Sequence, residues 1–239
     1  MPIPTSSLRS ERICVWCGLA LVVLLGVGFV LAGLVPPPSP ASSGEQIRDF
    51  YAENADLKRV GIILLSVGGS LFLPFGVAVA AQLRRIEGPG SPAAYVQLGA
   101  ATITAATTII YTFMMLTLAY RPDGRSPDVM LALNDLAWLP FVGVWSPGAL
   151  QAAAVAVAIF ADRRPPGERI LPRWLGWVSA WMAFTSLTGS LVPFFTDGPF
   201  AWNGLIGFYV AATVFLGWYL AVFTVLLRTT APRVRGAAT

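Results

Sequence analysis

The segment AAYVQLGAATITAATTIIYTFMMLTLA, residues Ala93–Ala119, decides the fold, because its 27 residues contain no charged side chain. A helix needs roughly 20 such residues to cross the hydrocarbon core of a bilayer, which is about 30 Å thick. Five other stretches are also long and apolar enough to cross. The six predicted spans are residues 13–36, 60–83, 93–119, 131–161, 174–194 and 205–227. We therefore predict an all-α fold, a polytopic membrane helix bundle with six transmembrane helices.

The composition supports the membrane class. Hydrophobic residues make up 56% of the chain and charged residues 12%, which is about half of the charged share usual in soluble domains. Six spans and their loops occupy nearly all of the 239 residues and leave no length for a separate soluble domain. The chain is therefore expected to form a single integral membrane domain, residues 1–239.

The basic residues predict the orientation. Eleven of the 16 Lys and Arg residues lie at the two termini and in the loops after the second and fourth spans, and five lie on the opposite side. Basic residues beside a span tend to stay in the cytoplasm, so we expect both termini to be cytoplasmic in a multi-pass protein of the cell (plasma) membrane. The anionic headgroups of the lipid bilayer account for this basic side, and no nucleic acid is expected as a partner.

The region after the first span is the least regular. The first apolar stretch is longer than the core of a signal peptide, roughly 7 to 15 residues, so we expect it to be retained as a helix. Prolines at positions 36, 37, 38 and 40 are expected to end this helix and to begin a stiff, extended segment. Residues 46–56 then predict a short amphipathic helix on the outer surface, with Ile47, Phe50 and Tyr51 on one side.

The absence of histidine excludes many enzyme classes. Without it the chain cannot form a His-ligated haem, copper or iron site, a Ser-His-Asp triad or a His-containing zinc site. Cys14 and Cys17 are the only cysteines and supply too few ligands for a structural zinc site. We assign no catalytic residue, no metal site and no cofactor, and a non-catalytic role is favoured over an enzyme.

Asp135 is the ionisable residue that is most plausibly drawn into the bundle, and it lies beside Asn134 and ahead of Trp138. Counting back from the cytoplasmic end of the fourth span places it near the outer interface. Two alternatives are open: a solvated residue at the start of a helix, or a partly buried carboxylate that pairs with a basic residue. The basic residues considered as partners are Lys58, Arg59 and Arg121. A buried pair makes Asp135, Asn134 and Trp138 candidate ligand-binding residues.

A second candidate site follows from hydroxyl groups inside the third span. Thr104, Thr108 and Thr112 recur every four residues, and this spacing places them on one face of a helix. We expect the third and fourth spans to line an internal cavity that opens on the outer side. The residues expected to face it are Thr108, Tyr111, Thr112 and Trp145, with Gln151 on its wall. Close helix packing through small residues and hydroxyls is the alternative explanation.

Prolines inside the spans predict interrupted helices. Pro74, Pro140, Pro147 and Pro193 fall in or at the ends of spans, where each removes a backbone donor and is able to kink the helix. Interrupted helices at matched positions of two halves are typical of transporters. Pro74 and Pro147 match only roughly when the chain is shifted by 79 residues along itself.

The layout of the chain, with 15 arginines and one lysine, resembles small six-helix integral membrane proteins of unknown function that are common in high-GC bacteria. The resemblance implies the layout alone. The favoured function is binding or transport of a small apolar or amphipathic ligand. One alternative is a structural or accessory subunit that docks onto a larger membrane-protein partner. A membrane-embedded, lipid-modifying enzyme is a third possibility.

Overall fold

The computed structural model describes residues 5–230, and no strand occurs among them. Helices account for 79% of the structure. Six helical segments are long and apolar enough to cross a membrane, which confirms the six predicted spans. They are Arg9–Leu31, Ala55–Glu87, Pro92–Tyr120, Pro127–Ala161, Arg173–Phe194 and Leu205–Thr229. The predicted bounds of the third span are correct to one residue, whereas the second and fourth spans are longer than predicted.

Several spans consist of two helical pieces. The α-helices of the described part are α1 (Thr5–Leu31), α2 (Gly44–Ala52), α3 (Ala55–Ser70), α4 (Phe72–Glu87), α5 (Pro92–Tyr120), α6 (Pro127–Gly143), α7 (Ser146–Ala161), α8 (Arg173–Ser186) and α9 (Ala211–Thr229). Three short pieces of other helix types complete them: the 3-10 helices η1 (Pro122–Gly124) and η2 (Leu187–Phe194), and the π-helical η3 (Leu205–Val210). The second span is therefore α3 and α4, the fourth α6 and α7, the fifth α8 and η2, and the sixth η3 and α9.

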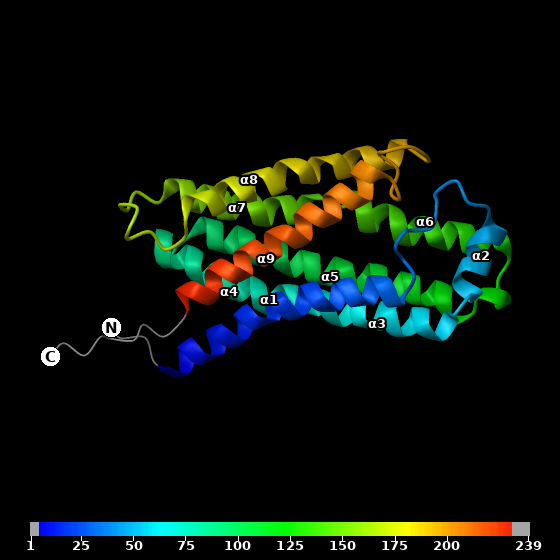
Figure 1. Ribbon diagram of the computed structural model, residues 1–239, viewed down its shortest axis with the longest axis horizontal. Helices are drawn as coiled ribbons and strands as arrows, with labels where there is room; N and C mark the ends of the chain where they lie inside the picture. Colours follow the sequence, from blue (N-terminus) through cyan, green and yellow to red (C-terminus); the bar gives the residue numbers. More distant parts are fainter. Residues whose placement is uncertain (1–4, 231–239) are drawn as a thin grey trace.

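The six spans form a ring in sequence order. Helix α1 packs against α3, α3 and α4 against α5, α5 against α6 and α7, α7 against α8, α8 against α9, and α9 returns to α1. Figure 1 shows α9 running obliquely between α8 and α1. We name the end of the bundle where α1 begins and α9 ends the terminal end, and the opposite end, which carries α2, the α2 end (Figure 1). A ring of this kind encloses an interior that side chains must fill.

The first span ends at a glycine and not at the prolines. Helix α1 stops at Leu31, five residues before Pro36. Gly33 has a φ of 62°, and its N–H donates to Val30 O at 3.0 Å while the N–H of Leu34 donates to Phe29 O at 3.0 Å. These two bonds satisfy carbonyls that a helix end leaves free, in the pattern of a Schellman motif. The expectation that the prolines end the helix is therefore wrong.

Helix α2 lies at the α2 end and packs mainly against α6. A capping box begins it: Ser43 Oγ accepts from the N–H of Gln46, and Gln46 Oε1 accepts from the N–H of Ser43. Its buried side chains are Ile47 and Tyr51, which confirms the predicted amphipathic helix. The helix ends at Ala52, earlier than predicted, because Asn54 adopts a left-handed backbone conformation with a φ of 52°.

The α1–α3 contact depends on glycines that let the two backbones approach closely. A Cβ atom on Gly61 would lie 2.4 Å from the backbone nitrogen of Ala32, and one on Gly28 would lie 2.8 Å from the carbonyl oxygen of Gly61.

At the terminal end, Glu11 holds α1 to α4, because its Oε1 accepts from Arg85 Nη1 and from Gln82 Nε2, both at 2.7 Å.

The interruption of the second span moves its second half into the ring. Helix α3 packs mainly against α1 and α5, whereas α4 touches α1, α5, α7 and α9. Pro74 lies in the first turn of α4, where a proline is tolerated because the N–H it lacks has no helical partner there. Phe72, at the junction, is buried and points toward the sixth span, where its ring lies 5.8 Å from that of Phe215. Helix α4 thus fills the interior at the terminal end.

Candidate functional site

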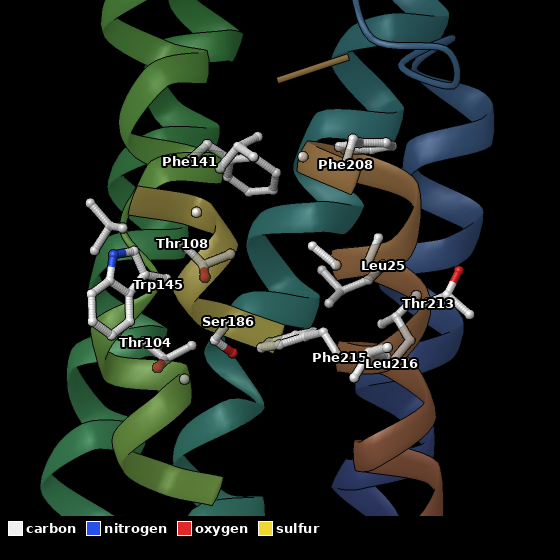
Figure 2. Close-up of a pocket in the computed structure, with 18 of the residues that line it drawn as sticks. Leu25, Thr104, Thr108, Phe141, Trp145, Ser186, Phe208, Thr213, Phe215 and Leu216 are labelled. Carbon is white, nitrogen blue, oxygen red and sulfur yellow. The ribbon is translucent and has the colours of Figure 1, made fainter. Parts of the chain in front are cut away.

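A cavity of about 460 Å³ lies in the middle of the ring. Its lining comes from α1, α5, the α6–α7 junction, α8 and the η3–α9 junction, with Phe72 from α4. Figure 2 shows Thr108 and Trp145 on one side of this space and Leu25 and Leu216 on the other. The volume falls within the range of about 300 to 1,000 Å³ that is typical of small-molecule sites.

Three of the lining spans lose regular α-helical structure at the level of the cavity. The fourth span breaks between Gly143 and Ser146, and Pro147 lies in the first turn of the next helix. The fifth span changes to 3-10 helix after Ser186, and the sixth span begins as π-helix and becomes α-helix at Ala211. Irregular backbone at membrane depth is tolerated where it is buried in protein or lines a cavity. These interruptions leave space that uninterrupted helices would occupy.

Aromatic rings close the cavity at the α2 end. The ring of Phe29 lies 5.9 Å from those of Phe141 and Phe208, and Trp138 lies behind them, 5.8 Å from Phe141 and 6.3 Å from Phe208. Figure 2 shows Phe141 and Phe208 facing each other across this end. We name Phe29, Trp138, Phe141 and Phe208 the upper aromatic cluster.

A second aromatic cluster closes the cavity toward the terminal end. The rings of Phe72, Phe215 and Tyr219 lie 4.8 to 5.8 Å from one another, and Phe75 lies 5.8 Å from Tyr219. We name these four residues the lower aromatic cluster. Because both ends of the cavity are aromatic, a bound molecule meets apolar rings above and below it.

Among the lining residues that are not exposed, three polar groups have no hydrogen-bond partner within residues 5–230: the hydroxyl groups of Thr108 and Tyr111 and the indole N–H of Trp145. The exposed hydroxyls of Tyr209 and Thr213 also lack a partner there. Other lining hydroxyls are occupied by their own helices: Thr107 donates to Ile103 O at 2.9 Å, and Ser186 donates to Met182 O at 2.8 Å. The three groups that are not exposed therefore offer two hydroxyls and one N–H donor to a ligand.

The structure brings together some of the predicted cavity residues and separates others. Thr108, Tyr111 and Trp145 line the cavity, in agreement with the predicted face. Thr112 does not, because its buried hydroxyl donates to Ile109 O, and its side chain lines a smaller pocket of about 110 Å³ between α3 and α5. The upper aromatic cluster covers the end at which the sequence predicts the opening.

Gln151 belongs to a buried hydrogen-bond chain that joins three helices. Its Nε2 donates to Thr104 Oγ1 on α5 at 2.8 Å, and its Oε1 accepts from the hydroxyl of Tyr219 on α9 at 3.1 Å. Thr104 in turn donates to Ala100 O at 3.0 Å. Gln151 is therefore engaged in helix packing beside the lower aromatic cluster and is absent from the cavity lining.

Trp138 and Asn134 are both completely buried near α2. Trp138 Nε1 donates to the hydroxyl of Tyr51 at 3.3 Å, which connects the upper aromatic cluster to α2. Burial raises the pKa of Tyr51 above its ordinary value, so the phenol stays neutral. The side-chain Oδ1 and Nδ2 of Asn134 have no hydrogen-bond partner among the described residues.

Of the two alternatives for Asp135, the ion pair does not form: its half-buried carboxylate pairs with no basic residue of the described part. Arg59 is engaged elsewhere, because it pairs with Asp56 at 2.6 Å and donates to the carbonyl of Ala119 at the end of α5, at 2.9 Å. Lys58 points toward the end of α1. Its Nζ lies 4.3 Å from the ring centroid of Phe50.

The position of Lys58 explains how a lysine that is only 6% exposed is accommodated. Its Nζ lies 3.3 Å from the point where a Cβ on Gly33 would be, next to the carboxyl end of α1. The helix dipole favours a cation there, and the aromatic face of Phe50 adds a cation–π contact. The lysine and the end of α1 therefore stabilise each other, without an ion pair to Asp135.

Sequence reasoning missed the contributions of the first, fifth and sixth spans to the cavity. Ser186, Phe208 and Phe215 line the cavity, although the predicted lining came from the third and fourth spans alone. The fifth span carries a dense run of small and hydroxyl residues from Thr185 to Ser190, which is the one signal able to indicate it. The sixth span offers none, because its aromatic residues resemble those of any lipid-facing helix.

Comparisons with models of protein families, with curated proteins and with solved structures found no match to this chain. Within the described range 5–230, no group of three or more Cys, Asp or Glu side chains comes together in a way that suits a metal ion. The cavity is therefore the candidate functional site.

Proposed function

We propose that this membrane protein binds a small, uncharged, largely apolar molecule in the central cavity without changing it chemically. The observation that carries the proposal is the lining itself: apolar and aromatic, with three free hydrogen-bonding groups from Thr108, Tyr111 and Trp145. Pockets for small molecules typically combine apolar walls with a few polar groups that fix the orientation of the ligand. A hydroxyl or carbonyl group on the ligand satisfies the indole N–H, which only donates.

The absence of charge in the lining defines the ligand further. No Asp, Glu, Lys or Arg of the described chain lines the cavity, and an ion in an apolar site without a partner is strongly disfavoured. A neutral molecule with one apolar body and one polar group meets both requirements.

We also propose that the protein lies in the plasma membrane in the orientation that its basic residues predict. Both ends of the chain are then in the cytoplasm, and the α2 end is outside.

Photolabelling tests the proposal. The purified protein in phosphatidylcholine liposomes is mixed with a decan-1-ol derivative that carries a diazirine, irradiated, and digested for mass spectrometry. We expect saturable adducts on peptides that contain Thr108, Phe141 or Phe215, displaced by unlabelled decan-1-ol. Labelling that does not saturate, or that falls only on lipid-facing peptides, would contradict the proposal.

A cavity-filling variant provides the matched control. Ala212 lines the cavity, whereas Gly217, on the same helix, is exposed, and a Cβ added to it meets no atom within 4 Å. Ala212→Phe is expected to lower the saturable labelling by about tenfold or more. Gly217→Phe should leave it unchanged, because the added ring faces outward.

The accessory-subunit alternative has one observation in its favour. Gly99, Thr102 and Ala106 are exposed along one side of α5, and small residues allow close contact between membrane helices. Thr102 donates its hydroxyl to Leu98 O at 2.9 Å, so the side chain does not need a partner protein. Co-purification of a second membrane protein that is lost on Gly99→Leu, without saturable cavity labelling, would favour this alternative.

A further inference from the structure

Aromatic side chains cover both ends of the cavity along the bundle axis. At the α2 end the upper aromatic cluster covers it, and Trp202 Nε1 donates to Pro38 O at 2.8 Å, which fixes the segment after α1 to the turn before the sixth span. Trp138 and Trp202 are 0% and 5% exposed. At the other end, Phe72 is 2% exposed and Tyr219 1%. The aromatic side chains that cover each end are therefore buried.

The side between α1 and the η3–α9 segment is different. Apart from Val144, the exposed residues of the lining are Val30 and Val35 on the α1 side and Tyr209 and Thr213 on the α9 side. Val30 is 71% exposed, more than any other large hydrophobic residue of the lining. The lining therefore reaches the outer surface of the bundle along this side.

Two aromatic contacts between the first and last spans lie along this side, and the exposed Val30 and Val35 lie on the α2-end side of Phe29. Phe29 meets Phe208 near the α2 end, with ring centroids 5.9 Å apart, and Trp16 meets Phe223 near the terminal end, at 5.5 Å. Between them, Gly26 lines the cavity, and a Cβ added to it meets no atom within 4 Å. The missing side chain leaves space beside α1 five residues before the helix ends at Leu31, in a span that is long and apolar enough to cross a membrane.

We propose that the ligand enters and leaves sideways, through the gap between α1 and the η3–α9 segment, directly from the lipid phase. The inference rests on the proposed function, because it names the route and the substrate class of the same cavity. The class is that of uncharged amphipaths dissolved in the membrane, such as a long-chain alcohol or a lipid-soluble ketone. Water-soluble solutes are excluded, because the gap opens onto hydrocarbon and the aromatic clusters close both aqueous ends.

Thiol accessibility tests the route. The Thr108→Cys variant is made in a background with Cys14→Ser and Cys17→Ser, reconstituted into liposomes, and treated with hexyl methanethiosulfonate or with its charged trimethylammonium-ethyl analogue. Rates are divided by those of each reagent with a free thiol in detergent. We expect the hexyl reagent to react at least about tenfold faster than the charged reagent, which corresponds to a barrier difference of about 1.4 kcal/mol.

Blocking the gap completes the test. Adding Gly26→Phe should slow the hexyl reagent by about tenfold or more, whereas Gly217→Phe, also in open space, should not change its rate. Ser186→Cys serves as a second cavity position if the first variant does not fold. Equal rates for both reagents, no effect of Gly26→Phe, or inertness of both cavity positions to the hexyl reagent would overturn the route.

The two proposals fail in different ways. If the protein binds no ligand, photolabelling with the decanol probe does not saturate, while the thiol rates still report whether the cavity opens to lipid. If binding is real and the route is wrong, labelling saturates in the unmodified protein and Gly26→Phe leaves the thiol rates unchanged.

Discussion

Replacing Gln151 by leucine should destabilise the bundle, because this amide joins three helices through two buried hydrogen bonds. Both bonds are lost in Gln151→Leu, and the hydroxyl of Tyr219 is left without its acceptor. Hydrogen bonds between membrane helices contribute about 0.6 kcal/mol on average and about 1.7 kcal/mol at most. The free energy of unfolding is therefore expected to fall by about 1 to 3 kcal/mol.

The assay is reversible unfolding in mixed micelles with increasing sodium dodecyl sulfate, followed by circular dichroism. A double-mutant cycle with Tyr219→Phe isolates the bond between the two side chains. Tyr219→Phe alone should lower the free energy of unfolding by roughly 0.5 to 1.5 kcal/mol, and it should have almost no effect in the Gln151→Leu background. A coupling energy close to zero would refute the reasoning.

Gln97→Leu is the matched control for Gln151→Leu, with the free energy of unfolding measured in the same way. It is 1% exposed, like Gln151, but its Oε1 has no hydrogen-bond partner in the described range. A buried acceptor that lacks a partner costs about 1 to 3 kcal/mol, so Gln97→Leu should leave the stability unchanged or raise it. If both leucine variants lose the same stability, the loss comes from altered packing, and the hydrogen bonds of Gln151 are not its cause.

Three further predictions follow from the packing, a buried amide and the charge distribution. Gly61→Leu should lower the unfolding midpoint in detergent by several degrees, because the added side chain meets the backbone of α1, whereas Gly26→Ala, in open space, should not change it. Asn134→Leu should raise the midpoint, since the amide is buried without a partner; a lower midpoint would mean that an ordered water satisfies it. In a background without other cysteines, Gly124→Cys should react in intact cells with an impermeant maleimide and Gly167→Cys should not; labelling of the second variant alone would reverse the proposed orientation.

Six spans and their approximate bounds are predictable from the sequence, because a bilayer tolerates only long apolar helices and the chain is rich in them. The Thr104–Thr108 stripe is predictable too, since helical spacing is a local property. What distinguishes Thr108 from Thr112 is not local. Thr108 lines the cavity, whereas Thr112 faces the groove between α3 and α5. The direction of each threonine depends on where neighbouring spans lie, which periodicity does not report.

The ion pair considered for Asp135 is absent for a related physical reason. A predicted bundle shows which charged side chains are near one another. It does not show whether a basic side chain has other, more favourable partners than a nearby carboxylate. Arg59 finds carbonyl groups at the end of α5, and Lys58 finds the end of α1 and the ring of Phe50. Backbone carbonyls at helix ends carry partial negative charge and compete with a carboxylate for the same cations. The sequence does not reveal which backbone carbonyls act as acceptors, because every residue has a carbonyl group.

The position of the cavity follows from where the spans stop being regular helices. In the second span the junction turns α4 inward, so that Phe72 and the lower aromatic cluster close the terminal end. In the fourth, fifth and sixth spans the interruptions fall at one level, and the side chains around them line the space. Prolines mark the first two of these places in the sequence, Pro74 and Pro147, but the 3-10 and π-helical turns carry no such residue at their junctions. The sequence alone therefore predicts the walls formed by the third and fourth spans, but it does not identify the first, fifth and sixth spans, which complete the cavity.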